Sequence, residues 1–453
     1  MSASAASPGL LRDLTSICGG DHVIEDALKL RRYAIDDVVP RAAVSPGTPA
    51  EVAAVLKFAH HHDVVVVPAG GFTHQGTGAI PDAVDILLRT DRLTAVEHYD
   101  PGDLTIGIGA GATLAEVERI IAPNRQLLPL DAPLPESCTV GGALAVAAHG
   151  PLKHAYGGVR DFCTGIRYVT VDGKLAKAGA RVVKNVAGYD MMKLLIGSFG
   201  TLAVITGASF KVYPAPRQTR TFIASFAGLP EVVRFRDQVL ASPLSPMCLE
   251  LVSPHAHRLL AGDSNQDDDS WRVLLRAAGS DAVLARYRTE LATWRLPPSA
   301  AAAREVSGEV ETQLWRHVGN WPHAVFEAAR NSALVRLDLP LQAVEPALAA
   351  AEQAATDNDF LFAAVGRIGA GSLLLAFLPI TPDPPAAMHY ANAVSALRGA
   401  LPRDASAIVL RCPLEAKRHF SVWGSTPNDL GAMRAIRDAF DERHILNRGR
   451  FLF

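Results

Sequence analysis

Hydrophobic positions in the first half of the chain alternate between helical spacing and short continuous runs. Residues 50–62 carry apolar side chains at helical spacing, and four valines at 64–67 follow as a buried strand. Strand-like runs at 83–88 and 104–108 come after turn residues. Residues 113–121 begin with a Thr and a Glu at the spacing of a capping box, which predicts a helix. Strands, helices and Gly-rich turns therefore succeed one another up to about Pro214.

The pattern changes after a Pro-rich polar stretch at 213–220, which we interpret as a domain boundary. Residues 221–425 mix alternating strand-like runs with Ala-rich helical segments. That mixture is typical of an α+β domain with an antiparallel sheet. The last stretch, 426–453, begins as an amphipathic helix and ends in a short loop.

Composition narrows the class of protein. The 453 residues are 49% hydrophobic and 20% charged, as in an ordinary globular protein, and the net charge of −2 offers no basic face for nucleic acid. Five scattered cysteines with no Cys-x-x-Cys pair predict reduced, buried thiols. We read no targeting peptide at the start and find no apolar run of membrane-spanning length. A cytoplasmic location is expected, and peripheral association with the inner membrane through partners stays open.

The valine strand at 64–67 runs directly into Pro68, Ala69, Gly70 and Gly71. Glycines lack the Cβ atoms that would hold a phosphate away from backbone N–H groups, so this loop could cradle an anion. A tight structural turn would explain the same two glycines. The residues alone leave both interpretations open.

Two further Gly-rich stretches bear on that choice. Gly107 to Gly111 has GxGxG spacing, and no acidic residue ends a following strand at the distance a nicotinamide site requires. A strand-to-helix turn is the better interpretation there. Residues 131–161 offer hydroxyl groups and bare backbone at Ser137, Thr139 and Gly141–Gly142. Two such loops far apart in sequence suit a long ligand bound along its length.

These stretches resemble the vanillyl-alcohol-oxidase or PCMH-type FAD-binding flavoproteins. Within that family the chain most resembles the FAD-binding E subunit of bacterial glycolate oxidase. The resemblance covers most of residues 35–215 and the last thirty, and rests on five motifs in order. These are VVVVPAGGFTHQG, TVGG, GPLKHAYGGVRDFCTG, KNVAGYDMMKLLIGSFGTLAVIT and AFDERHILNRGRF.

The resemblance implies an α+β fold with a two-subdomain FAD-binding domain and an α+β cap with an antiparallel sheet. We expect the FAD domain at 1–218, the cap at 219–425, and a C-terminal segment, 426–453, that returns to the FAD domain. The resemblance also implies which residues bind FAD: Pro68, Ala69, Gly70, Gly71, Phe72, Thr73, His74, Ser137, Thr139, Val140, Gly141, Gly142, Ile205 and Asn447.

Departures from the family pattern carry predictions of their own. Ala69 replaces a common Arg, and Phe72 replaces the third glycine of the loop, where its Cβ should tighten the turn. Relatives that hold flavin covalently place a His where this chain has Thr73, and His74 comes one place later. We therefore predict that FAD is bound non-covalently and that His74 is a polar loop residue.

The catalytic residues are not fixed by the sequence. Many 2-hydroxy-acid dehydrogenases of the superfamily carry metal-binding histidines on a cap strand, and RIGAGSLL at 367–374 occupies that strand here. Arg367 stands in place of the first His, so we predict no metal site and consider Arg367 a candidate to bind a carboxylate. His149 and His154 flank the second Gly-rich loop and are weak catalytic candidates.

The resemblance implies an FAD-dependent oxidoreductase subunit of glycolate-oxidase type. It would work beside a second flavin subunit and an iron–sulfur subunit on a small 2-hydroxy acid such as glycolate or D-lactate. Two alternatives stay open. One is a stand-alone FAD-dependent oxidase or dehydrogenase of an alcohol or 2-hydroxy acid, and the other is a scaffold subunit whose FAD is structural.

Overall fold

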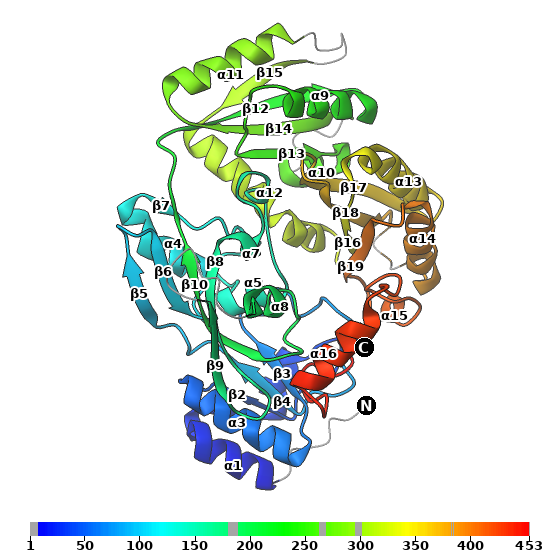
Figure 1. The fold of residues 1–453 in the computed structure, drawn as a ribbon. Helices are drawn as coiled ribbons and strands as arrows, with labels where there is room; N and C mark the ends of the chain where they lie inside the picture. The colour runs from blue at the N-terminus through cyan, green and yellow to red at the C-terminus, as the bar shows by residue number, and fades with distance from the viewer. Residues whose placement is uncertain are drawn as a thin grey trace. The chain divides into compact units, whose positions relative to one another are not determined.

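The computed structural model describes residues 8–179, 189–261, 269–294, 301–381, 383 and 385–452. The chain divides into two compact units (Figure 1). The first unit contains residues 1–149, 158–214 and 425–453, and the second contains residues 150–157 and 215–424. Residues 150–157 therefore pack with the second unit, although the sequence places them between two segments of the first.

The described residues of the first unit form helices and three sheets. Its helices are α1 (Pro8–Cys18), α2 (Ala27–Leu30), α3 (Pro49–His62), α4 (Leu114–Ile121), α5 (Val140–Ala145), α7 (Val159–Phe162), α8 (Met191–Leu195) and α16 (Leu430–Phe440). Its strands are β1 (Val23–Ile24), β2 (Ala42–Val44), β3 (Val66–Ala69), β4 (Ile86–Arg89), β5 (Val96–Asp100), β6 (Thr105–Gly109), β7 (Gln126–Leu127), β8 (Cys163–Val169), β9 (Leu175–Gly179), β10 (Val204–Lys211) and β11 (Tyr213–Pro214).

One sheet of the first unit has the order β1-β2-β4-β3, and β2, β4 and β3 run parallel. Helices α1 and α3 lie on one side of it (Figure 1), where their apolar side chains join the buried strand residues in one core. The second sheet has the order β5-β6-β10-β8-β9 and is antiparallel. Its core takes in residues of α4 and α5. The buried edge strand β3 begins at Val66, so it contains the last two valines of the run at 64–67 together with Pro68 and Ala69, two residues later than predicted.

The predicted helix at 113–121 is confirmed as α4, together with its capping box. Thr113 accepts from the Glu116 N–H at 3.2 Å, and Glu116 accepts from the Thr113 N–H at 2.7 Å. The preceding GxGxG stretch covers the end of strand β6, which contains Gly107 and Gly109, and the turn toward α4, which contains Gly111. A Cβ on Gly109 or Gly111 would overlap backbone of the segment 90–94. Close packing therefore explains these glycines without a nucleotide.

The C-terminal segment packs against β3 in the first unit. Val66 donates to Ile445 O at 2.8 Å, and Asn447 N donates back to Val66 O at 3.0 Å, as in a short parallel pairing. The buried carboxylate of Asp441 accepts the N–H groups of Ile445 and Leu446 at 3.1 and 2.8 Å. These bonds hold residues 445–450 beside the end of the valine strand.

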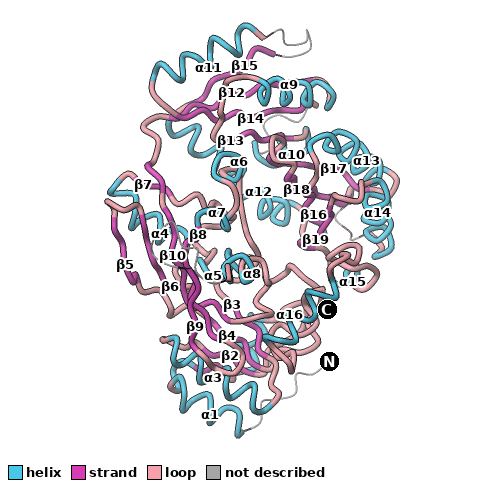
Figure 2. Tube along the Cα trace, in the orientation of Figure 1, coloured by secondary structure: helices cyan, strands magenta, loops and turns pink. Residues whose placement is uncertain are grey.

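The second unit is built on an antiparallel sheet with the order β15-β12-β14-β13-β17-β18-β16-β19. Its strands are β12 (Thr219–Phe226), β13 (Cys248–Val252), β14 (Trp271–Ala278), β15 (Ala301–Val306), β16 (Ala333–Asp338), β17 (Phe360–Arg367), β18 (Ser372–Pro379) and β19 (Ser406–Arg411). Its helices are α6 (Lys153–Tyr156), α9 (Leu229–Ala241), α10 (Pro254–Ala261), α11 (Asp281–Thr293), α12 (Gly308–Ala328), α13 (Val344–Thr356), α14 (Ala387–Ala400) and α15 (Leu414–Lys417). Helices α13 and α14 lie side by side next to β17 and β18 (Figure 2). The predicted α+β fold with antiparallel sheets is confirmed.

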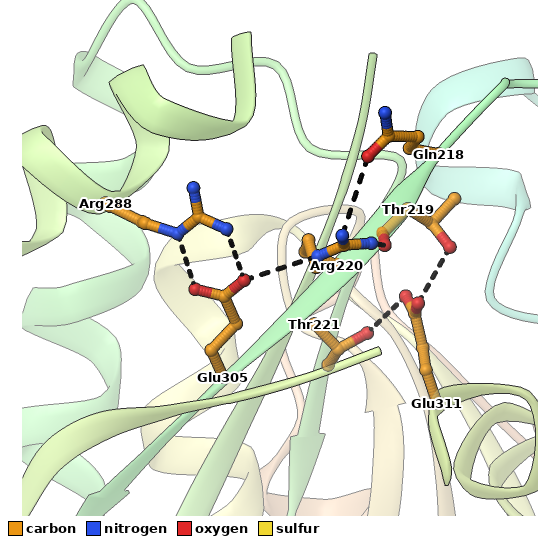
Figure 3. A network of polar contacts seen from close by, with 7 residues as sticks. All are labelled: Gln218, Thr219, Arg220, Thr221, Arg288, Glu305 and Glu311. Atoms are coloured by element: carbon orange, nitrogen blue, oxygen red, sulfur yellow. Dashed lines mark hydrogen bonds and ion pairs between the residues drawn. The ribbon is translucent and has the colours of Figure 1, made fainter. Parts of the chain in front are cut away.

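Two carboxylates hold strand β12 from different sides (Figure 3). Glu311, at the start of α12, accepts from the hydroxyls of Thr219 and Thr221 at 2.8 Å each, and Arg276 reaches it at 3.2 Å. Glu305 pairs with Arg288 and with Arg220. The side chain of Glu311 is only 2% exposed, so its hydrogen bonds offset the loss of water around the charge.

The five cysteines are free and buried, as we predict from their scatter. Within the described residues, no helix is long and apolar enough to span a membrane.

Candidate functional site

A cleft opens in the first unit at the end of β3. The loop after β3, the start of α5, the turn at Phe199–Gly200 and the C-terminal segment form its walls. The lining residues are Pro68, Gly70, Gly71, Phe72, Thr73, His74, Gln75, Thr139, Gly142, Ala145, Val146, Phe199, Gly200, Asn447 and Arg450. The Gly-rich loop and the tail, 375 residues apart, thus meet at one site.

The loop presents backbone donors to this cleft. In the described part of the chain, the N–H groups of Gly70, Gly71, Phe72 and Thr73 donate to no backbone or side-chain acceptor. Successive free N–H groups in a turn form a concave site for an anion. Buried or half-buried amides of this kind need a partner, which a phosphate group supplies well.

The two glycines are required by close packing between loops. A Cβ on Gly70 would overlap the hydroxyl of Thr139, and a Cβ on Gly71 would overlap the carbonyl oxygen of Ser137. The structure therefore shows that the two Gly-rich loops are in contact. The tight-turn and anion-cradle interpretations are compatible, because the same glycines that allow the packing leave the N–H groups uncovered.

Phe72 adopts a left-handed backbone conformation, which glycine adopts more readily than other residues. Its φ is 62°, a region that costs a non-glycine residue about 1 kcal/mol or more. Its ring lies 5.3 Å from the ring of Tyr33, which also carries the Arg89 guanidinium at 5.2 Å. Packing of the Phe72 ring offsets the strain in its backbone. The tighter turn that we expect from the Cβ of residue 72 is seen as this unusual φ angle.

Thr73 and His74 interact with each other beside the cleft. The Thr73 hydroxyl lies 2.8 Å from Nδ1 of His74. The Thr73 side chain also hydrogen-bonds the buried thiol of Cys138, whose pKa is raised to about 11, chiefly by burial. That thiol is protonated at neutral pH and is a poor nucleophile.

Asn447 is held rigidly at the cleft by the tail. Its φ is 48°, and its Nδ2 donates to Phe199 O at 2.6 Å. Its Oδ1 is buried and has no hydrogen-bond partner among the described residues. Because a buried orphan acceptor is costly, this oxygen is suited to a ligand that brings an N–H or O–H group.

The structure brings most of the predicted binding residues to the cleft, but not all. Those that line it are Pro68, Gly70, Gly71, Phe72, Thr73, His74, Thr139, Gly142 and Asn447. Ala69, Val140 and Gly141 are buried behind the lining, and Ser137 contributes its carbonyl to the packing of Gly71. Ile205 lies on β10 in the hydrophobic core of the antiparallel sheet and does not line the cleft.

Sequence reasoning missed several lining residues, chiefly Gln75, Phe199, Gly200 and Arg450. All four fall inside motifs that carried the family resemblance, so the signal was present in VVVVPAGGFTHQG, IGSFGT and LNRGRF. The motifs alone gave no physical reason to choose these positions. The structure supplies it, because the loop and the C-terminal segment are in contact at the cleft.

In the second unit, the stretch RIGAGSLL is a hairpin and not one strand. Arg367 ends β17 and Ser372 begins β18. The Arg367 side chain is 4% exposed and lies 3.8 Å from Glu250, which is 1% exposed on the neighbouring strand β13. Arg367 also donates to Ser372 O at 3.1 Å. We considered the Arg367 guanidinium as a group that binds a substrate carboxylate. In the structure it faces the buried carboxylate of Glu250 in the same unit.

The two histidine candidates belong to different units. His149 is half-buried at the end of a first-unit segment, and His154 lies on α6 in the second unit. The His154 ring packs over Gly369 in the 367–372 hairpin, where burial lowers its pKa below the ordinary value. His154 and Arg367 are thus brought to one hairpin. Lys184, in the most diagnostic motif, lies outside the described residues.

Part of the chain is similar in sequence to a known cofactor-binding domain. Residues 40–179 match the model of an FAD binding domain. The chain is 34% identical to D-lactate dehydrogenase of Archaeoglobus fulgidus over 48% of this chain and 50% of that protein. It is 27% identical to D-2-hydroxyglutarate dehydrogenase of Xanthomonas citri pv. viticola over 91% and 89% of the two chains. It is 38% identical to glycolate oxidase subunit GlcE of Escherichia coli over 34% and 44%.

The matched region thus spans about half the length of the D-lactate dehydrogenase and less than half of GlcE. Among solved structures, p-cresol methylhydroxylase with substrate bound superposes with a TM-score of 0.79 at 13% identity, covering 98% of this chain and 97% of that one. At that identity the likeness shows the fold alone.

The free amides, the orphan oxygen of Asn447 and the absence of acidic groups among the described lining residues fit a ligand with phosphates and hydrogen-bond donors. FAD has both. Residues 40–179 thus match an FAD binding domain, the chain has the fold of p-cresol methylhydroxylase, and its sequence is similar to D-lactate and D-2-hydroxyglutarate dehydrogenases and to a glycolate oxidase subunit.

Proposed function

We propose that the cleft at the end of β3 binds the pyrophosphate of FAD non-covalently. The free N–H groups of Gly70, Gly71, Phe72 and Thr73 would donate to phosphate oxygens. Asn447 would accept a hydrogen bond from an N–H or O–H group of the cofactor through Oδ1. The glycines keep the two loops in contact, so the donors are arranged before the cofactor arrives.

Bound FAD supplies a two-electron acceptor to which a substrate can transfer a hydride. The residues of this chain bind and orient it. At the position where covalent relatives are expected to carry a histidine, Thr73 carries no imidazole, and burial keeps the Cys138 thiol protonated. His74, which also lines the cleft, is hydrogen-bonded through its Nδ1 to the Thr73 hydroxyl.

We propose further that the chain is the FAD-binding subunit of a glycolate-oxidase-type complex that oxidises a small 2-hydroxy acid such as glycolate or D-lactate. The observation that carries this proposal is the pairing of Arg367 with Glu250 in the hairpin where catalytic relatives are expected to hold metal ligands. The two charges neutralise each other inside the second unit, which leaves the hairpin without the donor set for a dication. A second flavin subunit would then carry substrate oxidation, and an iron–sulfur subunit would accept electrons.

A stand-alone dehydrogenase is the second candidate. It is favoured by the match to D-2-hydroxyglutarate dehydrogenase, which extends over 89% of that protein and is not confined to the FAD domain. In this case His154, neutral at pH 7 because burial lowers its pKa, would be the group available beside the hairpin to accept a proton.

One experiment separates these proposals. The tagged chain is captured from native extract and, in parallel, purified alone, and both samples are mixed anaerobically with glycolate or D-lactate while the flavin absorbance is followed. A flavin that bleaches only in the captured complex supports the subunit role, with iron–sulfur absorbance in the same sample. Bleaching of the isolated chain at the rate of the complex contradicts the subunit role and supports the stand-alone enzyme. A protein that binds no FAD contradicts both.

A further inference from the structure

Arg450 is the cationic side chain at the end of the C-terminal segment, and it lines the cleft. The residue is 2% exposed, and arginines are rarely buried to that extent unless they are paired. No acidic side chain lines the same cleft among the described residues. Among the described residues that line the cleft, Arg450 is therefore the side chain that carries a full positive charge.

The guanidinium is fixed by bonds to the loop that carries the free amides. One terminal nitrogen, Nη1, donates to Oε1 of Gln75 at 2.8 Å. The other, Nη2, donates to the carbonyl oxygens of Gln75 and Thr77 at 2.7 Å each. The group also stacks 5.2 Å from the ring centre of Phe199. These contacts hold residues 75–77 in place immediately after the amides of 70–73.

Burial makes the charge on Arg450 unfavourable in the free protein. Desolvation lowers its pKa to about 10, attraction to the Asp36 carboxylate opposes that lowering, and the group stays positive at neutral pH. The three oxygens that it reaches through these bonds are neutral amide and carbonyl oxygens. An anion in the cleft would offset the desolvation directly, because Coulomb attraction is strong where water is excluded.

We propose that Arg450 is the charge and positioning residue for the pyrophosphate of FAD, acting both through its cationic field in the cleft and by fixing Gln75–Thr77 beside the amide donors. This inference rests on the proposed FAD site. It adds a cation contributed by the tail to a loop that has no Lys or Arg between residues 68 and 77. The C-terminal segment would then contribute the positive charge that the loop lacks.

The test uses three variants of the full chain, each freed of flavin. Arg450→Lys keeps the charge and loses the fork of donors, whereas Arg450→Gln loses the charge and keeps an N–H group. Arg448→Met is the matched control, because Arg448 lies two residues away on the same tail, pairs with Asp63 and does not line the cleft. FAD affinity is measured by flavin fluorescence, and the melting temperature of the apo-protein is measured with and without inorganic pyrophosphate.

We expect Arg450→Gln to weaken FAD binding at least 30-fold, Arg450→Lys to weaken it less than tenfold, and Arg448→Met to leave it within twofold of the parent. Inorganic pyrophosphate should raise the melting temperature of the parent and of Arg450→Lys, but not of Arg450→Gln. FAD binding by Arg450→Gln within threefold of the parent would overturn the inference while leaving the FAD site intact.

Equal losses in the Lys and Gln variants, with equally lowered apo melting temperatures, would assign Arg450 a purely structural role and also overturn it. A parent protein that binds no FAD would overturn the proposed function itself.

Discussion

Replacement of Gly71 by alanine tests whether contact between the two Gly-rich loops creates the FAD cleft. An added Cβ at this position would lie 1.5 Å from the carbonyl oxygen of Ser137, less than half of an ordinary van der Waals separation. Because both partners are backbone, no side-chain rotation can relieve the overlap. The loops must separate by roughly 2 Å, a shift of the kind that costs about 1–3 kcal/mol in a well-packed interior.

A displacement of that size moves the amide donors of residues 70–73 out of hydrogen-bond range of a bound phosphate. We therefore expect Gly71→Ala to weaken FAD binding by at least 100-fold, which is about 2.7 kcal/mol. The same reasoning shows that Gly71→Asp would not isolate the effect of charge, since its Cβ alone disturbs the loops. Alanine is the cleaner change.

The assay is a flavin fluorescence titration of apo-protein, with circular dichroism to confirm that the fold persists. Gly431→Ala is the control, because Gly431 lies in helix α16 of the same unit and an added Cβ meets nothing within 4 Å. That change should leave FAD affinity unaltered. Stoichiometric FAD in Gly71→Ala, at parental affinity, would refute the packing argument and with it the assignment of the cradle.

Three other predictions follow from the same structure. First, FAD is non-covalent, so acid precipitation should release all flavin into the supernatant, and fluorescence that stays with the denatured protein band would contradict this. Second, Glu311→Gln should lower the unfolding free energy of the second unit by about 3 kcal/mol, because it leaves the charge of Arg276 without its buried partner. The matched change Glu305→Gln, at a carboxylate 29% exposed, should lower it by less than about 1 kcal/mol, and equal effects would contradict the burial argument. Third, burial raises the pKa of Cys138 to about 11. Its thiol stays protonated in the fold while an unfolded thiol ionises near 9, so the stabilising difference is complete below pH 9 and is lost as the pH rises toward 11. Unfolding midpoints between pH 8 and 11 should fall less in Cys138→Ala than in the parent, and parallel curves would contradict the assignment.

Local features of the fold follow directly from the sequence. The valine run, the GxGxG turn and the capping box of α4 each depend on neighbours within a few residues. The family motifs likewise locate the Gly-rich loop, because glycine is needed wherever backbones approach closely. These sequence patterns predict local structure well because each depends only on residues close by in the sequence.

Contacts between residues that are far apart in the sequence could not be predicted from local patterns. Nothing near Arg367 in sequence reveals Glu250, which lies 117 residues earlier on the neighbouring strand. Residues 150–157 pack with the second unit although their sequence neighbours belong to the first. The tail motif indicated Asn447 but gave no physical reason for Arg450, whose function depends on contact with Gln75. Pairings of this kind are set by topology.

The most direct test of the FAD site is an experimentally determined structure of the flavin-loaded chain. We predict that the pyrophosphate oxygens lie within about 3 Å of the N–H groups of residues 70–73, with Asn447 Oδ1 accepting a hydrogen bond from the cofactor. Arg450 should lie against the phosphates, and no covalent density should join the flavin to residue 73 or 138. Flavin density elsewhere in the chain, with the cleft at the end of β3 filled by solvent, would contradict the account.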